Sequence, residues 1–190
     1  MKTQNTGFGT DKELVTAILN GDQQAFAVFV ALTENLVAKI VFQMTGGNAD
    51  RKDLAQEIYV KAFRNLASFR FGSKLSTWIG QIAYYEGLHY IRRKKLTYLE
   101  NIPEESAADN SSPAEERLFQ RDLSALLNVA IGKLPPLYQT LVTLFHEEEL
   151  SHAEIKQITG LPEGTIKNYL FRARRALRDD LLKQFDKEDL

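Results

Sequence analysis

Apolar residues recur at intervals of three and four along the first half of the chain, which is the period of an amphipathic helix. The pattern predicts helices over residues 23–44, 50–66 and 76 to about 94. A shorter helix is expected over residues 10–20, because Thr10 and Glu13 have the spacing of a capping box. The apolar residues that carry the first two stripes are Phe26, Phe29, Val30, Val37, Ile40, Val41, Leu54, Ile58, Ala62 and Leu66. Four helices this close in sequence can share one core.

The second half is expected to be helical as well and to contain a helix-turn-helix. Helices are predicted from about 114 to 132 and from 136 to about 145. Ser151 and Glu154 form another capping box, and the helix that they open ends near Gly160, a residue that tolerates the left-handed conformation of a C-terminal cap. Leu161 and Pro162 make the turn before a longer helix. No strand-like alternation is present, so the chain is predicted to be all-α.

Residues 99–113 have no helical period, contain two prolines and carry only negative charges. These properties are typical of a flexible, extended linker. We therefore predict two small helical domains, at 10–95 and 114–185, joined by an acidic linker at 96–113.

The composition limits the class of protein. With 44% hydrophobic and 26% charged residues, the chain is typical of a globular protein rather than a disordered one. No apolar run approaches the roughly 20 residues that span a bilayer, and the N-terminus lacks the apolar core of a secretory signal. The absence of cysteine excludes a disulfide framework and a thiolate metal site. We expect a cytoplasmic protein that needs no cofactor.

The net charge of −1 conceals a segregation of charge along the chain. Residues 51–95 contain ten Lys and Arg against three acids, whereas residues 96–122 contain seven acids against two Arg. The last predicted helix is basic again, with no acid between residues 164 and 178. Any one such cluster is most simply a solvated helix face. Two basic patches separated by an acidic stretch favour two contacts with nucleic acid.

A metalloenzyme is a weaker interpretation of the same sequence. The pairs Glu86/His89 and Glu149/His152 have the Glu-x-x-His spacing found in di-iron helix bundles. The second pair has the wrong geometry, because Ser151 is the predicted helix cap and leaves Glu149 outside the helix. Arg93, four residues after His89, would also repel a metal cation. We therefore predict no metal site and no catalytic residue.

The ordered set of motifs on both sides of the linker resembles the bacterial sigma-70 family, and within it the extracytoplasmic-function (ECF) sigma factors. The resemblance covers nearly the whole chain and implies two helical domains, called region 2 and region 4. The motifs of region 2 are Asp53-Leu54-Ala55-Gln56-Glu57-Ile58-Tyr59, Phe63, Ser76-Thr77-Trp78-Ile79, Ile82-Ala83 and Arg92-Arg93. Those of region 4 are Leu134-Pro135-Pro136, Leu150-Ser151, Glu154-Ile155, Gly160-Leu161-Pro162-Glu163-Gly164-Thr165-Ile166-Lys167 and Phe171-Arg172-Ala173-Arg174.

A polar face on the helix at 50–66 is the expected binding site for RNA polymerase core. Asp53, Gln56, Glu57 and Lys61 lie opposite the apolar stripe of that helix. Alone, such a face is most often only solvated. The resemblance implies that it docks on the clamp helices of the β′ subunit, where acids would pair with arginines.

The loop at 69–75 and the helix after it match the part of the family that opens DNA and captures the −10 promoter element. Aromatic side chains suit this role, because stacking an unpaired base is worth roughly 1–3 kcal/mol. We expect Trp78 and one member of each neighbouring aromatic pair to be mainly core. The residues implied for −10 DNA are Phe69, Arg70, Phe71, Ser73, Lys74, Ser76, Trp78, Tyr84, Tyr85, His89, Arg92 and Arg93.

Two positions depart from the family pattern on this helix. Relatives often carry Asn and Asp, one turn apart, where this chain has Tyr85 and His89. The resemblance therefore does not specify which bases of the −10 element are bound.

The basic last helix is the expected reader of the −35 element. Arg and Lys can bind guanine O6 and N7, Asn can pair with adenine, and Phe can contact a thymine methyl. Tyr169 stands where relatives commonly have Arg. The residues implied for −35 DNA are Thr165, Lys167, Asn168, Phe171, Arg172, Arg174 and Arg175.

The resemblance implies an ECF sigma factor that brings RNA polymerase core to promoters and has no catalytic chemistry of its own. Its expected partners are the β′ clamp helices, the β flap, promoter DNA and an anti-sigma factor, which in many relatives is membrane-bound. The alternative is an autonomous helix-turn-helix repressor or activator, which would bind DNA alone and usually as a dimer.

Overall fold

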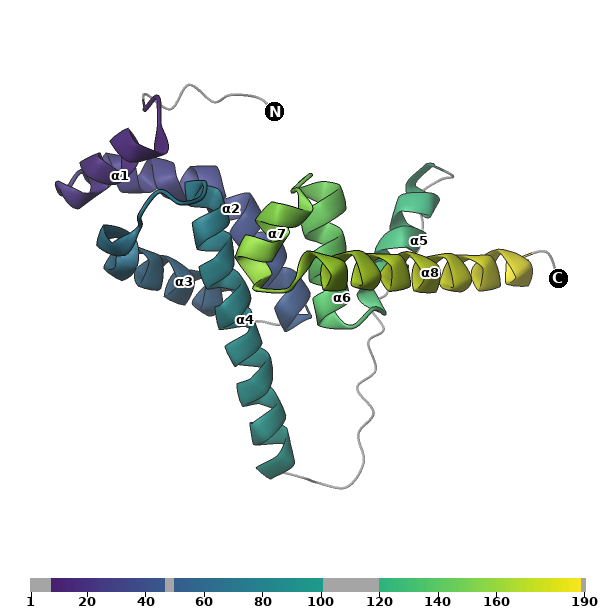
Figure 1. Ribbon diagram of the computed structural model, residues 1–190. Coiled ribbons are helices and arrows are strands. Elements are labelled where there is room, and N and C mark those ends of the chain that lie inside the picture. Colours follow the sequence, from purple (N-terminus) through teal and green to yellow (C-terminus); the bar gives the residue numbers. More distant parts are fainter. Residues whose placement is uncertain (1–7, 47–49, 101–119, 189–190) are drawn as a thin grey trace.

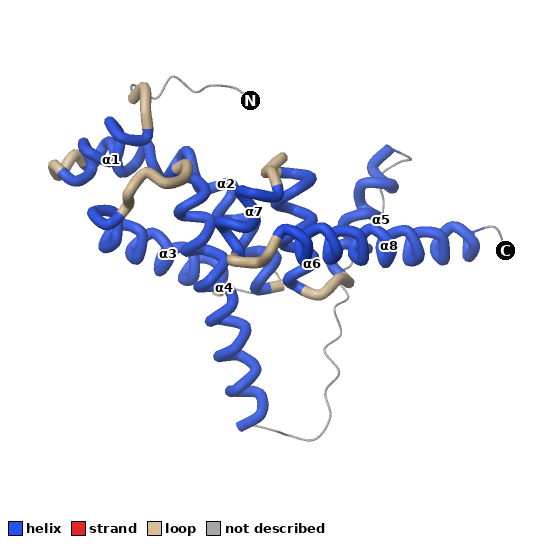
Figure 2. Tube along the Cα trace, in the orientation of Figure 1, coloured by secondary structure: helices blue, strands red, loops and turns tan. Residues whose placement is uncertain are grey.

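The computed structural model describes residues 8–46, 50–100 and 120–188 of the 190-residue chain, and these residues form helices and loops without a strand (Figures 1 and 2). The first unit comprises α1 (Asp11–Leu19), α2 (Gln23–Thr45), α3 (Arg51–Asn65), the 3-10 turn η1 (Leu66–Ser68) and α4 (Leu75–Glu100). The second comprises α5 (Gln120–Gly132), α6 (Pro136–Val142), the π-helical turn η2 (Thr143–Glu147), α7 (His152–Thr159) and α8 (Glu163–Glu188). The all-α prediction is confirmed for the described residues.

Side-chain caps fix where the helices begin and end. The Ser151 hydroxyl accepts the Glu154 amide, while the Glu154 carboxylate accepts the Ser151 amide at 2.9 Å, so the predicted capping box is present. Gly160 ends α7 with φ 73°, as predicted, in the conformation that favours glycine. The capping box expected at α1 is only half formed. Thr10 accepts the Glu13 amide, but the Glu13 carboxylate accepts the amide of Gly9 instead of Thr10.

The linker prediction is corrected at its first residues. α4 continues to Glu100, so residues 96–100 are helical rather than extended. Residues 101–113 of the predicted linker, and 114–119 of the predicted second domain, lie outside the described residues.

α2 lies at the centre of the first unit, against α1, α3 and α4. It is long and apolar enough to cross a membrane by length and composition alone, which the sequence analysis missed. The side chains that it buries give another reason for this composition. Phe29, Val37, Ile40 and Val41 are at most 1% exposed and form the middle of the core. We read α2 as a core helix.

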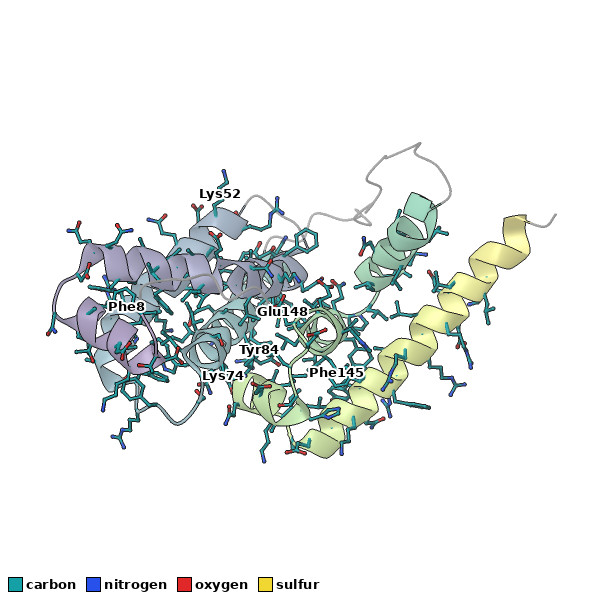
Figure 3. The ribbon with its side chains drawn as sticks, turned by 90° about the horizontal axis from the view of Figure 1, so that it is seen from above. Phe8, Lys52, Lys74, Tyr84, Phe145 and Glu148 are labelled. Carbon is teal, nitrogen blue, oxygen red and sulfur yellow. The ribbon has the colours of Figure 1, made fainter. Side chains whose placement is uncertain are left out.

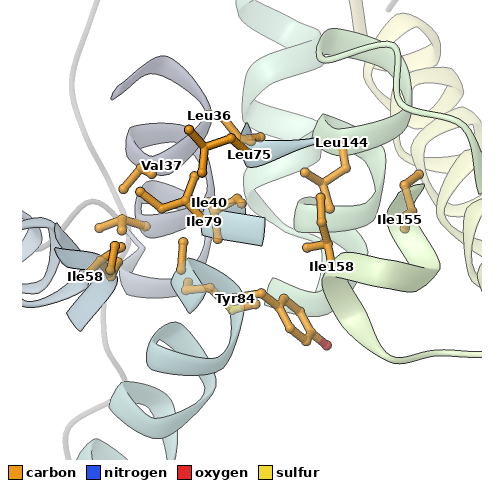
Figure 4. Close-up of a cluster of buried hydrophobic side chains, with 14 of the residues drawn as sticks. Leu36, Val37, Ile40, Ile58, Leu75, Ile79, Tyr84, Leu144, Ile155 and Ile158 are labelled. Atoms are coloured by element: carbon orange, nitrogen blue, oxygen red, sulfur yellow. The ribbon is translucent and has the colours of Figure 1, made fainter. Parts of the chain in front are cut away.

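The two units pack directly against each other, which the sequence did not predict. α4 lies against α7, and α2 lies against α6. Figure 4 shows a cluster of buried side chains that continues from Leu36 and Ile79 of the first unit to Leu144 and Ile158 of the second. The described residues therefore share one hydrophobic core.

Polar contacts surround this junction. Lys39 of α2 forms ion pairs with Glu147 at 3.0 Å and Glu148 at 2.7 Å. Burial lowers the pKa of Lys39, but its hydrogen bonds to Glu148 and Glu147 outweigh that effect and raise the pKa above 10.5. Gln43 donates to the Thr143 hydroxyl at 3.0 Å. Charged groups of opposite sign thus face each other across the junction.

Candidate protein and nucleic-acid interfaces

The polar face predicted on α3 is exposed in the structure. Asp53, Gln56, Glu57 and Lys61 line one shallow depression of about 680 Å³, which Glu86 of α4 closes on one side. The Lys61 ammonium donates to the Glu86 carboxylate, and Glu86 therefore joins α3 to α4. The sequence analysis missed this partner because the two residues are on different helices. The depression holds the carboxylates of Asp53 and Glu57 beside the cations of Lys61 and Arg64, and such a charged surface suits a charged protein partner.

An apolar groove adjoins the polar face and was also missed. Phe26, Tyr59, Val60 and Phe63 line it, with Gln56 shared between groove and polar face, and its volume is about 580 Å³. Phe63 is 54% exposed, and its ring meets Phe26 edge-on at 5.3 Å between centroids. Exposed apolar residues beside a charged face are typical of a protein-binding surface.

The loop between η1 and α4 holds an aromatic cluster. The Phe69 ring lies between those of Phe71, at 4.8 Å, and Trp78, at 5.3 Å. Phe69 is buried, whereas Phe71 is 44% exposed and has φ 55°. A positive φ is strained for a bulky residue and is found where the surrounding structure requires it. Phe71 is thus the most exposed ring of a cluster in which Phe69 is buried and Trp78 is half-buried.

A cavity of about 380 Å³ lies beside this cluster. Phe69, Arg70, Ser73 and Trp78 line it from the first unit, and Gln157 of α7 lines it from the second. Ser76, which the resemblance also implies for −10 DNA, is half-buried. The Lys74 ammonium donates to Glu154 at 2.7 Å.

The tyrosine pair on α4 is divided between core and surface, as expected. Tyr84 is 3% exposed, and burial raises the pKa of its phenol. Tyr85 is 39% exposed. His89, Arg92 and Arg93 are exposed further along the same helix. Phe69 and Tyr84 are thus the buried members of their pairs and support the exposed rings of Phe71 and Tyr85.

The predicted reading face of α8 is open to solvent. Lys167, Asn168, Phe171 and Arg172 are all exposed, and Phe171 is 62% exposed. The opposite face is buried and fixes the orientation of the helix, through Ile166, Leu170, Ala173 and Leu177. An exposed phenyl ring between basic and amide side chains has no packing role here. It is available for contact with a base edge.

The remaining residues of α8 have other neighbours. Thr165 is half-buried, and the Tyr169 ring stacks against Tyr138 of α6 at 5.2 Å between centroids. The Arg174 side chain donates to the Leu170 carbonyl, and Arg175 lies 3.9 Å from Asp179. Tyr169 therefore packs within the second unit, while both arginines keep exposed side chains.

The structure contradicts the di-iron interpretation. Glu149 precedes α7 and lies outside any helix, as expected from the cap at Ser151. Glu86 and His89 lie 4.0 Å apart, but Glu86 is paired with Lys61. Within residues 8–46, 50–95 and 125–183, no group of three potential ligands could hold a metal ion.

Comparison with known proteins identifies the family of this chain. Residues 29–97 match the family model for sigma-70 region 2, and residues 124–177 match that for sigma-70 region 4. The ECF RNA polymerase sigma factor SigW of Bacillus subtilis is 32% identical over 180 residues, which is 90% of this chain and 96% of that protein. The chain belongs to the ECF sigma factors. It is therefore a transcription initiation factor rather than an autonomous repressor.

Other relatives support the same assignment. The ECF sigma-E factor of Escherichia coli K12 is 32% identical over 177 residues, covering 88% of this chain and 92% of that protein. Two solved structures share the fold. One is CnrH in complex with the cytosolic domain of CnrY, with TM-score 0.63, 21% identity and coverage of 92% and 97%. The other is RpoE of Bartonella quintana in complex with the anti-sigma factor NepR, with TM-score 0.62, 24% identity and coverage of 80% and 93%.

Proposed function

We propose that the polar face of α3 binds RNA polymerase core and that α8 and α4 bind the two promoter elements. The observation that supports core binding is the exposed depression lined by Asp53, Gln56, Glu57 and Lys61. Its carboxylates would pair with arginines of the β′ clamp helices. The apolar groove at Phe63 would add buried area to the same contact.

For the −35 element, we propose direct reading by Lys167, Asn168, Phe171 and Arg172. All four are exposed on one face of α8, and α7 precedes this helix as in other helix-turn-helix proteins. Thr165, Arg174 and Arg175 would contact the neighbouring phosphates, which fixes register without specifying sequence.

For the −10 element, Phe71 and Tyr85 would stack on unpaired bases, since each is the exposed ring of its pair. Phe69, Trp78 and Tyr84 would support them from below. Arg70, Ser73, Lys74 and Ser76 lie on the loop and the start of α4, and His89, Arg92 and Arg93 lie further along it. These residues would hold the backbone and phosphates of the opened strand.

The protein would act in the cytoplasm without a cofactor and without catalytic chemistry of its own. Relatives with this fold have been solved in complex with CnrY and with the anti-sigma factor NepR. By analogy, an anti-sigma factor would hold this chain inactive until a signal releases it. Region 4 would contact the β flap.

Run-off transcription with purified core polymerase over a library of promoter fragments tests this function. We expect specific initiation only when the protein is present, and loss of initiation on Glu57→Arg, because the new cation would repel the clamp arginines. Glu34→Arg makes the same charge change at another exposed residue and should keep activity. Tight binding of the protein alone to palindromic DNA, with no initiation, would contradict the proposal.

A further inference from the structure

We propose that Gln81 of α4 reads one base of the −10 element and that its side-chain amide selects an unpaired adenine. Gln81 is not in the set of residues that the resemblance implies for −10 DNA. The inference rests on the proposed role of α4 in binding this element, and it assigns one base of the element to one side chain.

Gln81 lies on the face of α4 that carries residues proposed for −10 DNA. Residues three or four positions apart share a face of a helix, and Gln81 follows Trp78 by three positions and precedes Tyr85 by four. His89 and Arg92 continue the same stripe at spacings of four and three. The side chain of Gln81 is exposed. It therefore lies in the middle of the proposed −10 face.

The side chain of Gln81 also lines the cavity beside the aromatic cluster. That cavity has a volume of about 380 Å³, and its wall includes Phe69 and Trp78. Gln157 of α7 lines it from the second unit, and Figure 3 shows Tyr84 of α4 beside that unit. A flipped base is held by stacking on aromatic side chains and by hydrogen bonds to its edge. The wall of this cavity contains groups of both kinds.

The amide of Gln81 is available to a ligand, whereas two hydroxyls of the same wall already donate to the backbone. The Ser68 hydroxyl donates to the Asn65 carbonyl at 2.6 Å, and the Ser73 hydroxyl donates to the Lys74 carbonyl at 3.3 Å. Within the part of the chain that the structure describes, the side-chain amide of Gln81 makes no hydrogen bond. Both its donor and its acceptor can therefore bind a base.

A glutamine amide matches the edge of adenine. It presents N–H donors beside a carbonyl acceptor, and glutamine pairs with adenine N6 and N7 through two hydrogen bonds in duplex DNA. An adenine that has left the stack also presents N6 beside N1, so the same amide can bind it from either edge. Neither the phenol of Tyr85 nor the guanidinium of Arg92 has a donor and an acceptor on two neighbouring atoms. The chemistry of this helix face thus favours Gln81 as the reader of adenine.

Binding of holoenzyme to promoters with single-base changes tests the proposal. On a promoter identified by run-off transcription, each base pair of the −10 element is replaced in turn, and the dissociation constants are compared. The unsubstituted protein should prefer one adenine over other bases by roughly 5- to 150-fold, the range for a good bidentate contact. Gln81→Ala should abolish this preference and leave the preferences at the other positions of the element unchanged.

Two further changes identify the groups that form the contact. Gln81→Glu replaces the donor nitrogen with a second acceptor, so binding should shift from adenine towards cytosine, whose N4 amino group donates to carboxylates. Replacing the adenine by purine removes only the N6 amino group. That replacement should weaken binding by the unsubstituted protein and should not affect Gln81→Ala. Because Gln81 is exposed, both variants should keep the helix content of the unsubstituted protein by circular dichroism.

Gln157→Ala is the matched control, because it removes the same amide group from another residue of the cavity wall. It should leave the base preferences unchanged. The proposal would be overturned by loss of the adenine preference in Gln157→Ala, by an equal loss at every −10 position in Gln81→Ala, or by a preference there for another base. Absence of core-dependent initiation would instead contradict the proposed function, so the two failures are distinguishable.

Discussion

The two proposed DNA-binding faces differ in how the fold presents them. On α8, Lys167, Asn168, Phe171 and Arg172 are exposed and lie on one helix. On the −10 side, Lys74 is paired with Glu154, and the cavity beside the loop is bounded by Gln157. The first face lies within its own unit, while the second also contacts residues of the other unit.

This difference has a physical consequence for how each proposed face is oriented. A face built on one helix needs only that helix to be oriented, which the buried residues Ile166 and Leu170 provide. The proposed −10 face depends in addition on contacts with the other unit, such as that between Lys74 and Glu154.

The largest expected effect comes from the core between the units. Ile158→Ala removes a fully buried side chain and should lower the free energy of unfolding by about 2–5 kcal/mol. Urea unfolding followed by circular dichroism and by the fluorescence of Trp78, the one tryptophan, measures it. Leu32→Ala, at a residue 48% exposed, should change stability little. Equal stability of the two variants would show that Ile158 does not hold the units together.

The next effect concerns the face on α8. Arg172→Ala should weaken promoter binding by holoenzyme by about 1–3 kcal/mol, the value of a good bidentate contact with a base. Measurements on promoters with single-base changes should show that the lost binding energy belongs to one base pair of the −35 element. Arg178, paired with Asp179 at 3.1 Å, offers a control. Arg178→Ala should leave the binding of all promoter variants unchanged, and a uniform loss with Arg172→Ala would contradict direct reading.

A smaller effect is expected at the basic end of α4. Arg92 is exposed, and its contact with a phosphate would release counterions. Arg92→Ala should reduce the slope of log K against log salt for holoenzyme on promoter DNA by about 1. Lys133, which is bound to Asp180, lies outside the proposed faces, and Lys133→Ala should leave the slope unchanged. Identical slopes for both variants would show that Arg92 does not contact a DNA phosphate.

The smallest effect is the pH dependence of the contact between Lys74 and Glu154. The hydrogen bond from Lys74, together with those from Ser151, lowers the pKa of Glu154 from 4.5 to about 2. Because the pKa is lowered in the folded protein, the stabilisation is complete above about pH 4.5 and is lost as pH falls towards 2. The contribution of Glu154 to the free energy of unfolding should be constant above about pH 5 and fall in acid.

Glu154→Gln isolates this group from Glu147 and Glu148, the other carboxylates at the junction. The difference in the free energy of unfolding between the unsubstituted protein and Glu154→Gln should shrink below about pH 4.5. A difference that stays constant down to pH 2 would show that ionised Glu154 does not stabilise the folded protein.

Much of the candidate site could be predicted because its features are local. The capping box at Ser151, the glycine cap at Gly160 and the buried and exposed faces of α8 depend on residues within one or two turns. The resemblance to sigma factors could be stated from motifs of the same kind. The exposure of Asp53, Gln56 and Glu57 also agreed with the helical period alone.

Other features depended on residues far apart in the chain. Nothing near Lys61 indicates its bond to Glu86, and nothing near Gly80 indicates that Ile158 packs against it. The helical continuation of α4 through residues 96–100 was also missed, since the five residues Leu-Thr-Tyr-Leu-Glu are too few to show a helical period.

The sequence by itself determined which segments are helical, where the caps lie and which family the chain resembles, because hydrogen bonds and side-chain spacing within a few residues decide these properties. Only the tertiary structure decided that region 4 packs against region 2 beside the loop at residues 69–75. The pair that marks this contact, Lys74 and Glu154, is separated by 80 residues. Such a contact forms only when helices from both units bury apolar surface together, and no local pattern encodes it.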